Sequence, residues 1–173
     1  MLPLVLLAAA ATPAPAVSPI LPVPLQPIVA AANRTCAAKT ASGLGYSVLK
    51  TAEGPKAGAT DYVLVSYIGY LAANGQVFDQ AASTPMPVDG VIPGFSEGLK
   101  LIPRGGIYRF CVPAALGYGA ESAGPIPANS DLVFQVELLD SRTAAEIETM
   151  RKAAAPAAES AAPAPAPAPA PGK

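Results

Sequence analysis

Few side chains in this 173-residue sequence can carry out acid–base or covalent chemistry. The sequence holds 11 Lys plus Arg, 12 Asp plus Glu and no His, with a formal net charge of -1. The absence of His excludes Ser-His-Asp and Cys-His catalysis and imidazole metal sites. Two Cys cannot form a thiolate zinc site, and the charge balance provides no basic face for nucleic acid. Any reaction must therefore use apolar surface, backbone amides, hydroxyl groups and a few carboxylates.

Asp79 is the carboxylate with the most suggestive position. It follows Phe78 at the end of an expected short strand, just after a tight hairpin turn at Asn74-Gly75. Asp79 is either a solvated turn residue or part of a binding site. All ten Phe and Tyr residues lie between Tyr46 and Phe134, within a segment that has little charge and Gly/Pro-rich loops. These features favour an apolar pocket on the face of a sheet, suited to an apolar peptide or small molecule.

The elements that must position these side chains can be predicted from alternation and turn residues. Phe95, Leu99 and Ile102 have helical spacing between Pro93 and Pro103, which predicts one short helix. Five segments have the composition of strands, and together they predict an α+β domain with an antiparallel sheet: 43–50, 61–71, 76–79, 106–112 and 131–139. Residues 80–85 and 113–130 are expected to be loops, and 142–152 a helix leading out of the domain.

The two ends of the sequence differ in composition from its middle. Of 21 Pro, 7 lie in residues 1–27 and 6 in residues 156–171. The predicted organisation has five parts: a leader at 1–32, a linker with Cys36 at 33–43, one domain at 44–140, a short helix at 141–152 and an Ala/Pro-rich disordered tail at 153–173. The tail favours solvated polyproline II, as a passive spacer or as a docking segment for a partner.

The first residues resemble a secretory signal. The apolar run 4–11 is too short to span a membrane, and Ala14-Pro15-Ala16 has the small residues that a signal peptidase accepts. Cleavage is expected there, or alternatively after Ala32. We therefore expect an exported, periplasmic protein; the alternative is a disordered Pro-rich leader.

Cys36 and Cys111 are the only cysteines, and an even number in an exported protein favours a disulfide. If Phe110 and Val112 face the core of a strand, Cys111 faces outward, where the segment containing Cys36 could reach it. The alternative is two unpaired thiols.

Six short runs carry a family signature: VSYIG at 65–69, GQVFD at 75–79, VIPGF with GL at 91–99, ALGYG at 115–119, GPIP at 124–127 and LVFQVELL at 132–139. In this order, they make residues 44–140 resemble the FK506-binding-protein (FKBP) class of peptidyl-prolyl cis-trans isomerases. The resemblance implies a five-stranded antiparallel sheet curled around one short helix. It also implies an enzyme that accelerates rotation about Xaa-Pro bonds in exported proteins with no metal or other cofactor.

The resemblance also implies site residues. Catalytic roles fall on Asp79, Tyr118 and Phe134, and the substrate-binding positions are Tyr67, Phe78, Met86, Val91, Ile92, Phe95 and Ile126. In this hypothesis the Ile92 N–H and the Tyr118 hydroxyl anchor peptide carbonyls, and Asp79 either orients Tyr67 or polarises the carbonyl region. Three positions depart from the family pattern: Phe95 replaces the usual Trp, Met86 a usual aromatic residue, and Gly90 a frequent Glu or Gln. In addition, the short loop expected at 80–85 lacks the Arg that can pair with the pocket carboxylate, here Asp79.

The expected partners are proline-containing polypeptides and FK506-type macrolides, bound by a monomer without nucleic acid or a membrane span. Two other functions remain open from the sequence. One is a non-catalytic, peptide-binding chaperone of the cell envelope. The other is a structural protein in which the domain anchors the Pro-rich tail.

Overall fold

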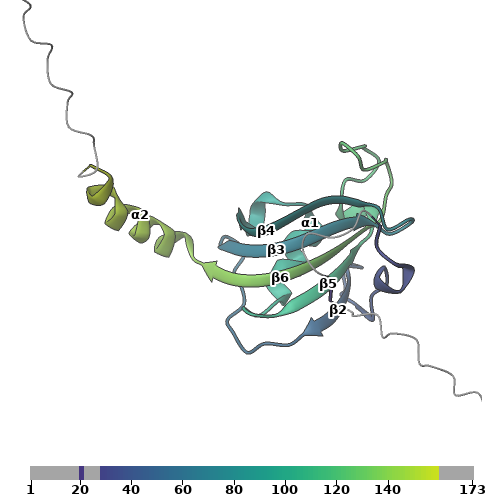
Figure 1. The fold of residues 1–173 in the computed structure, drawn as a ribbon, viewed down its shortest axis with the longest axis horizontal. Coiled ribbons are helices and arrows are strands. Elements are labelled where there is room, and N and C mark those ends of the chain that lie inside the picture. Colours follow the sequence, from purple (N-terminus) through teal and green to yellow (C-terminus); the bar gives the residue numbers. More distant parts are fainter. Residues whose placement is uncertain (1–19, 22–27, 160–173) are drawn as a thin grey trace, which may run out of the picture.

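The computed structural model describes residues 20–21 and 28–159 of the chain (Figure 1). A single antiparallel sheet holds six strands, in the order β1-β2-β5-β6-β3-β4. The strands are β1 (Ala38–Lys39), β2 (Gly45–Lys50), β3 (Tyr62–Leu71), β4 (Val77–Pro87), β5 (Ile107–Val112) and β6 (Leu132–Arg142). The helices are α1 (Pro93–Leu101) and α2 (Ala144–Glu159), with short 3₁₀ turns η1 (Ala31–Asn33), η2 (Val88–Gly90) and η3 (Ala114–Leu116).

The α+β fold class and the five predicted strands are confirmed, with two-residue β1 as an addition at one edge. β1 pairs Ala38 with Tyr46 and Lys39 with Gly45 in β2. A strand of two residues is too short to show the alternation from which strands are predicted. Helix α1 begins at Pro93, where a residue without an N–H is tolerated because the first turn has no acceptor for it.

The prediction of a loop at residues 80–85 is wrong, because β4 continues through them to Pro87. Pro85 and Pro87 are unusual inside a strand, since Pro cannot donate a hydrogen bond to a neighbouring strand. β4 is the outermost strand next to β3, however, and an edge strand needs donors on one side only. The pairing with β3 shifts register between Val65 and Tyr67, opposite Ser83, whose φ of 50° marks the irregularity.

Helix α2 projects away from the end of β6 (Figure 1). Thr143 and Glu146 form its N-terminal cap: the Glu146 carboxylate accepts from the Thr143 N–H at 2.8 Å, and Thr143 Oγ1 accepts from the Glu146 N–H at 3.2 Å. The helix reaches Glu159, so it continues into the predicted Ala/Pro-rich tail, of which residues 160–173 lie outside the described residues. No helix in the described part of the chain is long and apolar enough to cross a membrane.

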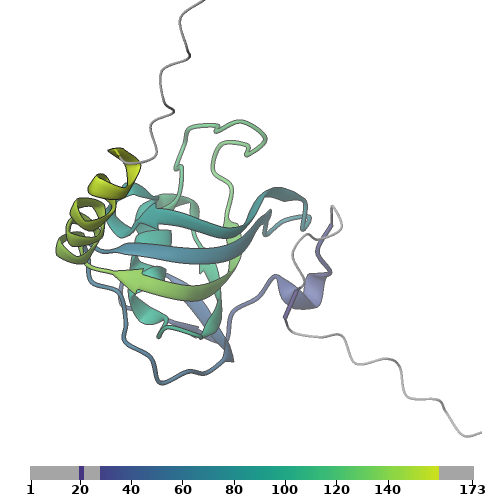
Figure 2. The same ribbon diagram turned by 60° about the vertical axis from the view of Figure 1, so that its left-hand side comes forward.

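The sheet curls around α1, and the hydrophobic core lies between the sheet and this helix (Figure 2). The face of the sheet that borders this core is called here the inner face. Leu99 of α1 and Phe110 of β5 are fully buried there. The helix comes unusually close to β5 because Gly98 has no side chain: a Cβ at this position would lie 2.8 Å from the Phe110 ring. This close packing brings the first turn of α1, with Phe95, against the middle of the sheet.

A second, smaller cluster lies on the outer face of the sheet, because side chains alternate between faces along a strand. It contains the buried residues Val29, Ile68, Tyr70 and Val133. Cys111 packs against this cluster and is joined to Cys36 by a disulfide with an S–S distance of 2.06 Å. Residues 28–32 of the predicted leader therefore lie on the folded domain; residues 1–19 and 22–27 are outside the described residues.

Candidate active site

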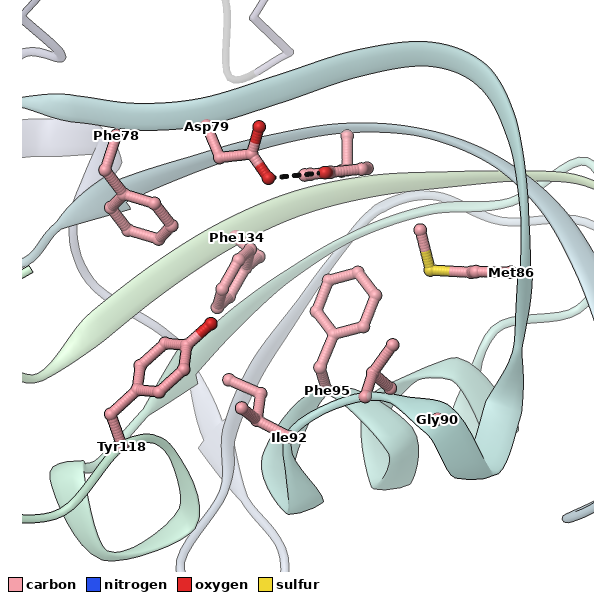
Figure 3. Close-up of a pocket in the computed structure, with 10 residues that line it drawn as sticks. Phe78, Asp79, Met86, Gly90, Ile92, Phe95, Tyr118 and Phe134 are labelled. Atoms are coloured by element: carbon pink, nitrogen blue, oxygen red, sulfur yellow. Dashed lines mark hydrogen bonds between the residues drawn. The ribbon is translucent and has the colours of Figure 1, made fainter. Parts of the chain in front are cut away.

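A pocket of about 350 Å³ opens on the inner face, between the β3–β4 pair and the first turn of α1 (Figure 3). Gly90 lines this pocket, together with nine of the ten residues predicted to form the site. These nine are Tyr67, Phe78, Asp79, Met86, Val91, Ile92, Phe95, Tyr118 and Phe134. They come from the strands β3, β4 and β6, from the η2–α1 turn with the start of α1, and from the loop between β5 and β6. Five of the six runs that carry the family signature thus contribute to one cavity; the run at 124–127 does not.

Three phenylalanines and Tyr67 form an edge-to-face network at the base of the pocket. Ring centroids lie 4.9 Å apart for Phe95 and Phe134, 5.6 Å for Phe78 and Phe134, and 5.9 Å for Tyr67 and Phe95. These are the geometries that aromatic quadrupoles prefer. Phe95 is only 4% exposed, so its ring is closely packed by its neighbours. The result is a rigid apolar surface on which a small ring could lie.

Gly69 is a pocket-forming residue that the sequence reasoning did not single out. It lies in β3, and a Cβ there would be 2.8 Å from ring atoms of both Phe78 and Phe134. Its missing side chain therefore makes room for these two rings to meet. A Gly inside a strand pattern often marks a close approach of this kind, and that signal was present in the sequence.

Tyr67 and Asp79 form the one polar pair in the pocket wall. They come from the adjacent strands β3 and β4. Tyr67 lies opposite Ala81, and Asp79 lies opposite Gly69. Tyr67 and Asp79 are therefore diagonal neighbours on the same face of the sheet. The Tyr67 hydroxyl donates to Asp79 Oδ2 at 2.6 Å, drawn as the dashed line in Figure 3. Burial, followed by this hydrogen bond and the negative charge of Asp79, raises the pKa of Tyr67 well above its ordinary value. Tyr67 is therefore a persistent donor, and it gives Asp79 a partner where the sequence offers no Arg.

The turn between η2 and α1 presents backbone to the pocket. The Ile92 carbonyl accepts from the N–H groups of Phe95 and Ser96, both at 3.0 Å, and so begins the helix. Within the described residues, the Ile92 N–H donates to no other group. A donor that lines an apolar cavity and has no internal acceptor is suited to a carbonyl oxygen of a bound peptide.

Tyr118 reaches the pocket from the long loop between β5 and β6, and is 42% exposed. The base of this loop is closed by two hydrogen bonds, from the Ala114 N–H to Asp131 Oδ1 at 2.9 Å and from the Asn129 N–H to the Gly119 carbonyl at 2.7 Å. The sequence reasoning did not identify Asp131. The loop is anchored on both sides of Tyr118, so the position of that hydroxyl depends on the loop's base.

Ile126 is the predicted site residue that the structure does not place in the pocket lining. It is 4% exposed and belongs to the inner-face core. A tight turn holds it there, with mutual backbone hydrogen bonds to Ala123 at 3.0 Å. Asp79 is the one charged residue in the lining, and no group of three or more His, Cys, Asp or Glu able to hold a metal occurs among the described residues.

The comparisons with known proteins agree with this geometry. A sequence model described as FKBP-type peptidyl-prolyl cis-trans isomerase matches residues 54–139. A solved structure titled as a peptidyl-prolyl cis-trans isomerase from Pseudomonas syringae pv. tomato is 34% identical, with a TM-score of 0.59, and the match covers 61% of this chain and 80% of that one. The chain belongs to the FKBP-type family.

Two longer relatives extend this result. The FKBP-type peptidyl-prolyl cis-trans isomerase FkpA of Escherichia coli K12 is 42% identical over 128 residues, which is 71% of this chain and 47% of FkpA. The outer membrane protein MIP of Legionella longbeachae is 40% identical over 109 residues, 60% of this chain and 46% of MIP. This FKBP-type chain therefore spans less than half the length of either relative.

Proposed function

We propose that this protein is a peptidyl-prolyl cis-trans isomerase that accelerates rotation of Xaa-Pro bonds in polypeptides. The observation that carries the proposal is the rigid, apolar, aromatic pocket with one internally paired carboxylate, in a chain of the FKBP-type family. Its volume of about 350 Å³ suits a proline ring and its flanking groups.

The mechanism follows from the electronic structure of the amide. Resonance holds the peptide bond planar behind a barrier of about 18–20 kcal/mol, and the twisted transition state has lost part of that resonance. A planar amide is more polar than a twisted one, so an apolar, water-poor site favours the transition state over the ground state. No proton transfer or nucleophile is required, which is consistent with a sequence that has no His.

Each element of the pocket has a role in this proposal. The proline ring lies on Phe95 between Phe78 and Phe134, while the Ile92 N–H holds a substrate carbonyl and the Tyr118 hydroxyl a second polar group. The hydrogen bond from Tyr67 supports the orienting role for Asp79, because the carboxylate is held by the phenol and fixes that ring in turn. Phe95 in place of the usual Trp gives a smaller base, and Met86 adds an adaptable side wall.

A protease-coupled isomerisation assay on Ala-Xaa-Pro peptides tests the proposal. The folded protein should accelerate the cis-to-trans step above the uncatalysed rate. Phe134→Ala and Asp79→Ala should each reduce kcat/KM at least ~10-fold, which corresponds to about 1.4 kcal/mol of transition-state stabilisation. Tyr62→Ala, at an aromatic residue that is 42% exposed and outside the pocket, should leave the rate unchanged. No acceleration by folded protein would refute the enzyme, and retained peptide affinity in that case would point to a chaperone.

We further propose that the protein is exported to the periplasm, acts on proline-containing polypeptides there as a monomer, and binds FK506-type macrolides in the same pocket. A relative named as an outer membrane protein supports export, and so does the Cys36–Cys111 disulfide, since such bonds persist in oxidising compartments. Fractionation of expressing cells tests the location, and light scattering tests the monomer. Competition by FK506 in the isomerisation assay tests macrolide binding.

A further inference from the structure

The segment 28–36, called here the strap, is tied to the hairpin between β3 and β4, and Figure 2 shows it in purple beside that end of the sheet. The Val29 N–H donates to the Gly75 carbonyl at 2.7 Å. Arg34 donates from Nε to the Val29 carbonyl at 2.9 Å and from Nη1 to the Ala73 carbonyl at 3.2 Å. A single arginine thus ties the strap both to itself and to the hairpin.

The strap also completes the outer-face cluster. Val29 is 2% exposed, while its neighbour Ile28 is 66% exposed. Val29 packs with Ile68, Tyr70 and Val133, each of which is fully buried. Without Val29, three apolar side chains on the outer face of β3 and β6 would lose part of their cover from water.

Asn33 is the polar centre of the strap and is 5% exposed. Its carbonyl accepts from the Tyr70 hydroxyl at 2.5 Å, and its Oδ1 accepts from Arg109 Nη2 at 3.0 Å. Its N–H donates to the Ala30 carbonyl at 2.9 Å. Three residues later, Cys36 fixes the strap to β5 through Cys111.

A contact further upstream continues the same pattern. The side-chain amide of Gln135, itself 5% exposed, pairs with the backbone of Leu21 in both directions. The Leu21 N–H donates to Gln135 Oε1, and Gln135 Nε2 donates to the Leu21 carbonyl, both at 2.8 Å. Leu21 also packs against the outer-face cluster, so the folded domain has contacts that begin before the strap.

These contacts decide between the two cleavage sites that the sequence leaves open. Cleavage after Ala32 would remove Val29 and the acceptor of Arg34. It would also remove the Ala30 carbonyl that accepts from the Asn33 N–H, and it would create an ammonium group at Asn33, whose Oδ1 accepts from the Arg109 guanidinium. Cleavage after Ala16 would leave every one of these contacts intact.

We propose that export processing occurs upstream of Ile20, so that residues 20–21 and the strap remain in the mature protein and belong to the folded domain. The inference rests on the proposed export. It is compatible with the processing site expected at Ala14-Pro15-Ala16, and it assigns to residues 28–32, which lie within the predicted leader, a role in covering the outer face of the sheet.

The first test is the intact mass of the protein recovered from the periplasm after expression of the full-length gene. A mature chain that begins at Val17, or at any residue up to Ile20, supports the proposal. A chain that begins at Asn33, or at any residue from Leu21 onward, overturns it. Full-length protein that stays in the cytoplasm would refute export instead, and the second test then decides the role of the strap.

The second test compares two neighbouring residues of the strap in the protein as it is recovered. Val29→Ala should lower the Tm by about 5 °C, because the deleted methyl groups fill the outer-face cluster. Ile28→Ala, at the exposed neighbour, is the matched control and should leave the Tm unchanged. Equal Tm values for Val29→Ala and the wild type would show that the strap does not contribute to the fold.

Discussion

The hydroxyl of Tyr67 and the carboxylate of Asp79 show how one charge can be accommodated in an apolar cavity. The carboxylate accepts a short hydrogen bond of 2.6 Å from a phenol that burial keeps protonated. A hydrogen bond to a charged group is stronger than one between neutral groups. The pair therefore holds two walls of the pocket in register without an Arg or a His.

A flat pH profile follows from this pair. The pKa of Tyr67 is raised in the folded protein, so the phenol loses its proton only above the range where a free tyrosine ionises, about pH 10. The contribution of this group to stability is fully present below about pH 10 and is lost as the pH rises further. We expect kcat/KM to be constant from about pH 6 to about pH 9 in a pH series of the isomerisation assay. A bell-shaped profile in that window would show that a titrating acid or base takes part.

Gly69→Ala should reduce activity with little change to the rest of the fold. The added methyl group would lie 2.8 Å from ring atoms of Phe78 and Phe134, so both rings must shift in the pocket. We expect kcat/KM to fall about 10-fold, with a rise in KM, because the surface that receives the proline ring is displaced. Gly58→Ala is the matched control, since its Cβ would meet only the side chain of Asp61, 3.3 Å away. Equal kinetics for both variants would show that the contact between the rings is not needed.

At the scale of elements, Asp131 connects the start of β6 with the loop that carries Tyr118. Its Oδ1 accepts from the Ala114 N–H at 2.9 Å, and its carbonyl accepts from the Ala72 N–H at 3.0 Å. One residue thus links the end of β3, the first turn of the loop and β6. We infer that Asp131 is a positioning residue for Tyr118.

Asp131→Ala should lower kcat about five-fold, since an intramolecular hydrogen bond contributes about 1 kcal/mol. Asp131→Asn keeps an oxygen acceptor and should restore most of the activity. In a Tyr118→Phe background, Asp131→Ala should cause no further loss, because the hydroxyl that it positions is already absent. Asp61→Ala removes a similar side-chain acceptor, for the Gly58 N–H, in a turn outside the pocket and is the control. Additive losses in the double variant would mean that Asp131 acts independently of Tyr118.

The elements also show which parts of the fold the sequence could predict. The long strand β3 and the helix α1 were predicted because each has a sustained period and clear boundary residues. β4 was predicted only in part: the tolerance of Pro85 and Pro87 depends on the strand being at an edge, which is a property of the whole sheet. The site residues came mainly from the family signature. Asp131 was missed because its role is a contact between segments that are distant in the chain. Gly69 carried a signal, a glycine inside a strand pattern, but that signal does not show which rings approach it.

At the scale of the whole molecule, the two faces of one sheet have separate roles. The inner face, with Tyr67 and Phe134, forms the pocket, and the outer face, with Ile68 and Val133, is covered by the strap. Adjacent residues of the same strands therefore belong to different sites, because successive side chains point in opposite directions. A change on the outer face should alter stability before it alters catalysis.

Removal of the disulfide tests this separation. Cys36 and Cys111 are 75 residues apart, and in the chain-entropy model a loop of this size stabilises the folded state by about 4 kcal/mol. The double variant Cys36→Ser/Cys111→Ser should therefore have a free energy of unfolding, measured with urea, that is lower by about this amount. Its kcat/KM under conditions where it remains folded should match the wild type, because neither cysteine lines the pocket. Reduction of the wild-type protein should reproduce both results, which separates the loss of the bond from the effect of the serines. A large loss of activity in fully folded protein would show that the outer face is coupled to the pocket through β5 and β6.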